Sequence, residues 1–101
     1  MQLANAGRAQ RREPRQKVFR LVTLGVLGIR HRAHILDLSQ SGARVHCDVA
    51  ITPGHGVTLC IGERILKARV VWTHDKRIGI AFHVPLPADA VEEIAAGDCV
   101  A

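Results

Sequence analysis

The segment ILKARVVWT, residues 65–73, alternates apolar and polar side chains over most of its length. Successive side chains of a β-strand point to opposite faces, so this pattern predicts a strand with one buried face. The buried face would hold Leu66, Ala68, Val70 and Trp72, and the other face would hold Lys67, Arg69, Val71 and Thr73.

Five further short apolar segments surround this one in the chain. They span residues 18–24, 33–38, 43–47, 57–61 and 78–83. Turn-forming residues separate them, which predicts six strands with close connections. Short strands that each have one dry face are typical of an antiparallel barrel or sandwich rather than of βαβ units. Residues 87–96 precede Gly97 and begin at a proline, which predicts one short helix that caps this structure.

Length and composition predict a single globular domain. The chain has 101 residues, of which 48% are hydrophobic and 23% charged, and dividing it would leave neither half with a sufficient core. Its longest apolar runs are too short for a membrane helix, so we expect no membrane insertion. Residues 1–20 lack the apolar stretch of a signal peptide, and we therefore expect a cytoplasmic protein.

The cysteines and histidines indicate neither a disulfide framework nor a metal site. Cys47, Cys60 and Cys99 are an odd number without a CxxC pair, and the six histidines form no pattern with ligand spacing. We expect Cys47 and Cys60 to lie in or near the core. No general base is placed for Ser39 or any other nucleophile, so we predict no catalytic residues and no enzyme activity.

The excess positive charge is confined to the N-terminal segment. Residues 1–20 hold six basic residues and one acidic residue, whereas residues 21–101 hold eight of each. A basic arm on a neutral body favours an anionic partner, such as a phosphate-bearing ligand, a nucleic acid or a membrane surface. A solvated tail that only increases solubility is the alternative.

Two short motifs have the chemistry of a guanine nucleotide site. In the first, Arg11 and Arg15 lie four residues apart beside a proline. In the second, Asp37 lies at the end of a predicted strand, and Ser39 and Gly42 lie in the turn that follows it. Guanidinium groups bind phosphate and the O6/N7 edge of guanine, and a carboxylate accepts from its N1 and N2 donors. If Leu36 and Leu38 point inward, Asp37 lies on the outer surface. The second motif alone is also an ordinary turn.

In their order and spacing the two motifs resemble those of the PilZ domain family, RxxxR followed by (D/N)xSxxG. The resemblance runs from residue 10 to residue 82 and implies an all-β fold, a six-stranded antiparallel barrel with a short C-terminal helix. It implies a flexible basic arm over residues 1–16 and one barrel domain over residues 17–97. By position it assigns cyclic di-GMP binding to Arg11, Arg15, Asp37, Ser39 and Gly42. Secondary contacts would come from Arg8, Arg12 and Trp72, although Trp72 is interpreted first as a packing residue.

The resemblance favours a receptor for this bacterial second messenger that needs no cofactor and signals to a protein partner when the ligand orders the arm. One alternative is a small basic barrel that binds RNA or single-stranded DNA. That reading is disfavoured because base stacking needs several aromatic side chains and the chain has only Phe19, Trp72 and Phe82. A second alternative is a PilZ-like module that binds proteins without the ligand.

Overall fold

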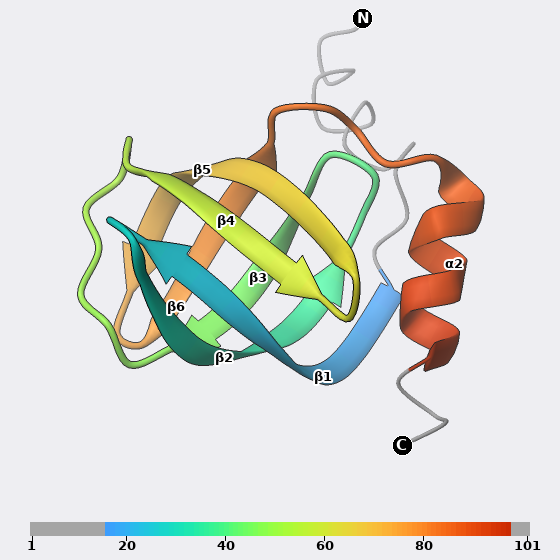
Figure 1. The fold of residues 1–101 in the computed structure, drawn as a ribbon, viewed down its shortest axis with the longest axis horizontal. Helices are drawn as coiled ribbons and strands as arrows, with labels where there is room; N and C mark the ends of the chain where they lie inside the picture. Colours follow the sequence, from blue (N-terminus) through green and yellow to red (C-terminus); the bar gives the residue numbers. More distant parts are fainter. Residues whose placement is uncertain (1–15, 98–101) are drawn as a thin grey trace, which may run out of the picture.

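Six strands and one helix make up the computed structural model, which describes residues 16–97. The elements are β1 (Gln16–Val26), β2 (Ile29–Leu38), β3 (Gly42–Cys47), β4 (Gly56–Ile61), β5 (Arg64–His74), β6 (Arg77–Phe82) and α2 (Ala88–Gly97). Every neighbouring pair of strands is antiparallel, and the strands close into a barrel in the order β1-β2-β3-β6-β5-β4 (Figure 1). The predicted six-stranded antiparallel barrel and its C-terminal helix are confirmed.

The core fills the inside of the barrel with the apolar side chains that the alternation assigned there. Leu24, Ile35, Leu59 and Val70 are among the residues that are fully buried. Cys47 is buried and Cys60 half-buried, and both are free thiols, as expected. Closure removes most of the free strand edge that an open sheet would have. The shortest seam lies between β1 and β4, which pair only at Thr23, Leu24 and Gly25 of β1.

Two irregularities of register decide which way important side chains point. The β5–β6 register shifts between Val70 and Trp72, and Trp72 is 40% exposed. The prediction that Trp72 continues the buried face of its strand is therefore wrong, because this shift breaks the alternation. A second shift, between Ile35 and Asp37 in β2, leaves Leu36 only half-buried.

The hairpin between β1 and β2 is tighter than the sequence suggested. The predicted strands 18–24 and 33–38 left residues 25–32 between them, but β1 continues to Val26 and β2 begins at Ile29. Only Leu27 and Gly28 form the turn, with φ angles of 52° and 82°. Positive φ at both central residues defines a type I′ turn, which matches the twist of a hairpin.

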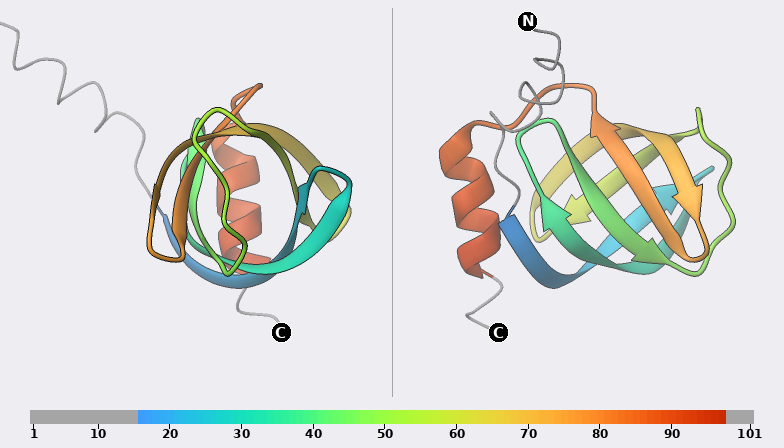
Figure 2. Two further views of the ribbon diagram at one scale, coloured as in Figure 1. Left: turned by 90° about the vertical axis from the view of Figure 1, so that its left-hand side faces the viewer. Right: turned by 180° about the vertical axis from the view of Figure 1, so that it is seen from behind.

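Helix α2 covers one end of the barrel, as both views in Figure 2 show. It buries Ala90, Val91 and Ile94, and the guanidinium of Arg20 on β1 donates from Nη1 to the Ile94 carbonyl oxygen at 3.2 Å. The expectation that the helix caps the barrel is confirmed. In the part of the chain from residue 16 to residue 97, no helix has the length and apolar character needed to cross a bilayer.

Candidate functional site

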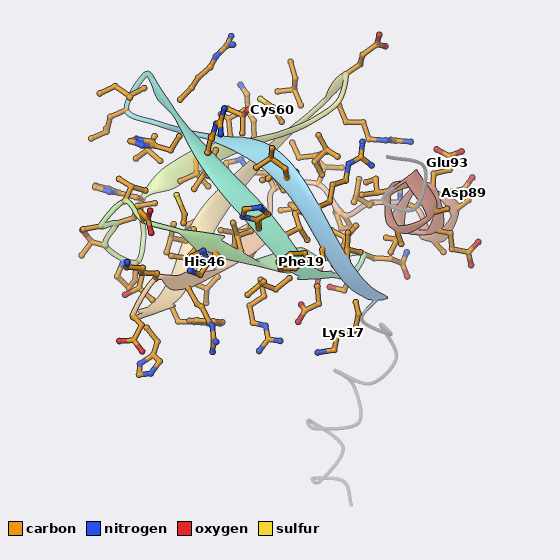
Figure 3. All side chains as sticks on the ribbon, turned by 90° about the horizontal axis from the view of Figure 1, so that it is seen from below. Lys17, Phe19, His46, Cys60, Asp89 and Glu93 are labelled. Carbon is orange, nitrogen blue, oxygen red and sulfur yellow. The ribbon has the colours of Figure 1, made fainter. Side chains whose placement is uncertain are left out.

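A groove of about 540 Å³ runs over the outer surface of β3, β6 and β5 and reaches the start of β1. Lys17, which projects from the start of β1 (Figure 3), contributes a cation to it. Its other lining residues include Asp37, Gly42, Arg44, Trp72 and Gly79. The groove thus combines charged side chains, an aromatic ring and glycines that expose the backbone.

A cross-strand ion pair forms one wall of the groove. Asp37 of β2 is paired in register with Arg44 of β3, and Arg44 Nη2 lies 2.8 Å from Asp37 Oδ2. Asp37 was expected on the outer surface. It does face the groove, but it is only 3% exposed. The pair fixes the direction in which the carboxylate points.

Arg44 also carries a buried donor without an acceptor. Its Nε is shielded from solvent and finds no hydrogen-bond partner in the structure. A buried polar group that lacks a partner costs about 1–3 kcal/mol, and such groups are rare in folded proteins. The arrangement therefore favours a bound acceptor at this wall of the groove.

Gly42 and Ser39 determine the shape of the loop between β2 and β3. A Cβ atom at Gly42 would overlap the Ile80 carbonyl oxygen and lie 3.3 Å from the Ile80 carbonyl carbon, so only glycine lets β3 lie this close to β6. Ser39 is 2% exposed. Its backbone N–H and its hydroxyl both donate to the Gly42 carbonyl oxygen, at 2.9 and 3.2 Å. Ser39 thus lies behind the groove wall and holds the turn.

The same loop is attached to the segment that leads into α2. The Leu86 N–H donates to the Gln40 carbonyl oxygen at 2.7 Å, and the Gln40 side-chain amide donates to the Leu86 carbonyl oxygen at 3.0 Å. The Phe82 N–H also donates to the Ser41 carbonyl oxygen at 2.8 Å. A displacement of the loop would therefore be transmitted directly to the start of the helix.

Trp72 forms a flat aromatic surface beside these groups. It is paired across the strands with Gly79 of β6, and a Cβ atom at Gly79 would overlap the indole Nε1 and Cε2 and lie 2.8 Å from Cδ1. The ring therefore lies over the glycine instead of standing away from the sheet. With 40% of the residue exposed, the indole can stack with a planar ligand.

Comparison with known families agrees with this geometry. The chain matches the PilZ domain over residues 9–97. It belongs to the PilZ domain family. PilZ domains generally bind cyclic di-GMP and are typically receptor modules without catalytic activity. The match includes both motifs, at residues 11–15 and 37–42. No curated protein is similar enough to the chain to be matched.

The structure brings together part of the predicted PilZ site. Asp37, Gly42 and Trp72 line one groove, while Ser39 lies behind its wall. The remaining predicted contacts fall outside the described residues; they are Arg8, Arg11, Arg12 and Arg15.

The sequence reasoning missed several of the residues that line the groove. Those with a role described above are Lys17, Arg44 and Gly79. Arg44 could have been found, because a short turn between the two predicted strands places it opposite Asp37 on the same face. Gly79 carries no comparable signal, since its role depends on how β5 and β6 are aligned.

No metal centre accompanies the groove in the described part of the chain. Across residues 16–97, no three histidine, cysteine, aspartate or glutamate side chains gather closely enough to hold an ion. The chemistry of the groove is therefore that of cations, one carboxylate and an aromatic ring.

Proposed function

We propose that this PilZ domain is a receptor that binds cyclic di-GMP in the groove between the Asp37–Arg44 pair and Trp72. The observation that carries the proposal is the groove itself, which places the Asp37–Arg44 ion pair beside an exposed indole face. The groove then offers an aromatic ring to a guanine base, a carboxylate to the N1 and N2 donors of the base, and cations to the phosphates.

The contacts follow from the groups in the groove. A guanine base stacks on the Trp72 indole, and such stacking is worth about 1–3 kcal/mol per base. Asp37 accepts from the guanine N1 and N2 donors, and Lys17 donates to phosphate or carbonyl oxygens. Arg44 Nε donates to the ligand once its guanidinium turns toward the groove, since this atom is shielded from solvent in the structure. Gly42 keeps the backbone close to the ligand. Ser39 contributes by holding the turn, and a direct contact would require its hydroxyl to leave Gly42.

The arginines of the first motif complete the proposed site. Arg15 precedes Lys17 by two residues, so covalent geometry keeps their Cα atoms within about 7 Å of each other. A residue so placed can reach a ligand in the groove, and we assign Arg11 and Arg15 to guanine and phosphate, with Arg8 and Arg12 as secondary contacts. The predicted arm, without Gln16, which already belongs to β1, orders in this proposal on binding, at a cost of about 1–2 kcal/mol per residue fixed. Affinity in the micromolar range is therefore expected.

The signal leaves the site through the loop between β2 and β3. Gln40 exchanges two hydrogen bonds with Leu86, so a loop displaced by the ligand changes the position of α2. The ordered arm and the displaced helix together present a new surface to a protein partner. This is a disorder-to-order switch coupled to a small movement of a helix.

Titration calorimetry with cyclic di-GMP tests the proposal. We expect micromolar binding to the wild type and a loss of affinity of about tenfold or more in Arg15→Ala. The control variant Arg77→Ala removes an exposed arginine of β6 that does not line the groove, and it should bind like the wild type.

Two results would contradict the receptor function. Absence of heat with cyclic di-GMP would leave the alternative of a module that binds proteins without the ligand. Equal binding of single-stranded RNA, with a strong salt dependence, would favour the nucleic-acid alternative. GTP serves as the control for binding of any guanine nucleotide.

A further inference from the structure

A second groove, of about 650 Å³, lies on the outer surface of the barrel around β1. Its lining residues include Leu21, Thr23, Arg30, Arg32, Cys60 and Ile65. It shares none of its residues with the proposed ligand groove. Nothing in the proposed binding of cyclic di-GMP accounts for it.

The strand pairing places this groove on the far side of the barrel from the ligand groove. Arg32 pairs with Thr23, Thr23 with Cys60, and Cys60 with Ile65, so one row of side chains crosses β2, β1, β4 and β5. The row is centred on the seam between β1 and β4, which lies opposite the seam between β3 and β6 in the closed barrel. Figure 3 accordingly shows Cys60 and Lys17 on opposite sides.

The groove combines exposed apolar side chains with two arginines and one acidic residue, Glu63, so its charge is net positive. Leu21 is 55% and Ile65 67% exposed. Arg30 and Arg32 stand beside them on β2, and neither forms an ion pair with any residue between 16 and 97. An apolar hollow with cations on one side is complementary to a partner that has an apolar stripe and acidic neighbours.

We propose that this groove binds an amphipathic helix of a protein partner, with acidic residues next to its apolar face. β1 pairs with β4 only through Thr23, Leu24 and Gly25, and the groove beside this short seam is lined by side chains of four strands. A partner that crosses four strands binds through side chains, as a helix does when it lies in a groove. The row from Arg32 to Ile65 covers three strand spacings, about 14 Å. That length accommodates about nine residues of helix.

Other occupants fit the groove less well. A two-fold dimer would bury the same groove of both copies, and because each copy brings two arginines and only one acidic residue, Glu63, the joined surface would carry excess positive charge. A membrane surface favours apolar side chains that project, whereas Leu21 and Ile65 line a hollow. This proposal rests on the proposed receptor function, because it names the surface to which the receptor's protein partner binds. Its test uses no dinucleotide, so a failure of one proposal can be distinguished from a failure of the other.

Selection of peptides from a random phage-displayed library against the full chain provides the test. We expect the selected peptides to share apolar residues at helical spacing with flanking aspartate or glutamate. Fluorescence anisotropy should show affinity reduced about tenfold in Arg32→Glu and in Ile65→Ser. The matched controls Arg77→Glu and Leu27→Asn change an exposed arginine and an exposed leucine outside the groove, and they should leave the affinity within about twofold.

A charge exchange makes the assignment specific. A peptide with lysine in place of its acidic residues should bind Arg32→Glu better than it binds the wild type. The proposal is overturned if the selected peptides are basic, if none is enriched, or if they bind the groove variants and the wild type equally. It is also overturned if sedimentation shows a dimer that Ile65→Ser dissociates, or if phosphatidylserine vesicles bind the protein through these residues.

Discussion

Replacing Gly42 by alanine tests the close approach of β3 to β6, on which the groove depends. The new Cβ would overlap the Ile80 carbonyl oxygen and lie 3.4 Å from the Ala81 Cα. Both are backbone atoms, so no side chain can rotate away and the two strands must separate. Overpacking of this kind costs about 1–3 kcal/mol, and the neighbouring hydrogen bond from the Phe82 N–H to the Ser41 carbonyl oxygen would add about 1 kcal/mol if it were lost.

A compensating term reduces this cost. The φ angle of Gly42 lies outside the left-handed region, so alanine can adopt the native backbone angles. Alanine also lowers the conformational entropy of the unfolded chain, which stabilises the folded state by about 0.4–1 kcal/mol. The balance is a destabilisation of about 2 kcal/mol. For a domain of this size that lowers the melting temperature by roughly 8–16 °C, which urea and thermal unfolding measured by circular dichroism can resolve.

Gly56→Ala is the matched control for this prediction. Gly56 begins β4, and nothing lies within 4 Å of a Cβ atom placed there. The control should therefore equal the wild type or exceed its stability slightly. If Gly42→Ala unfolds within about 0.5 kcal/mol of Gly56→Ala, a difference at the limit of such measurements, the steric reasoning is refuted.

Three other substitutions test the groove and the hairpin. Gly79→Ala displaces the Trp72 ring, so the affinity for cyclic di-GMP measured by calorimetry should fall about tenfold. The unfolding midpoint should change little, because the ring can rotate into solvent. Unchanged affinity would show that Trp72 does not contact the ligand. Arg44→Met takes the ion-pair partner from the buried Asp37 carboxylate, which costs about 3–5 kcal/mol, but it also removes the unpartnered Nε, which regains about 1–3 kcal/mol. The free energy of unfolding in urea should therefore fall by about 2 kcal/mol, a loss that the double variant with Asp37→Asn should partly recover. Leu27→Asn should raise the free energy of unfolding by about 1 kcal/mol, because Leu27 holds a φ of 52° that asparagine tolerates better. A less stable variant would show that the exposed leucine makes a contact that the turn geometry does not reveal.

Rules that act over a few residues determined most of the fold from the sequence. Alternation of period two and turn-forming residues placed all six strands, with their ends within a few residues of those observed. The proline before residues 88–97 and the apolar spacing within them placed the helix. These signals depend only on local backbone geometry and side-chain chemistry, and so they are visible without the tertiary structure.

The tertiary structure decided where the side chains of the site point. Closing the barrel fixed the register of β5 against β6, and the shift after Val70 turned Trp72 from the core to the groove. Pairing of β2 with β3 brought Arg44 to Asp37, and the close packing of β3 on β6 gave Gly42 its role. Register depends on how all six strands fit together around one core, and a single strand's pattern does not contain that information. The placement of the two grooves on opposite sides of the barrel follows from the same closure.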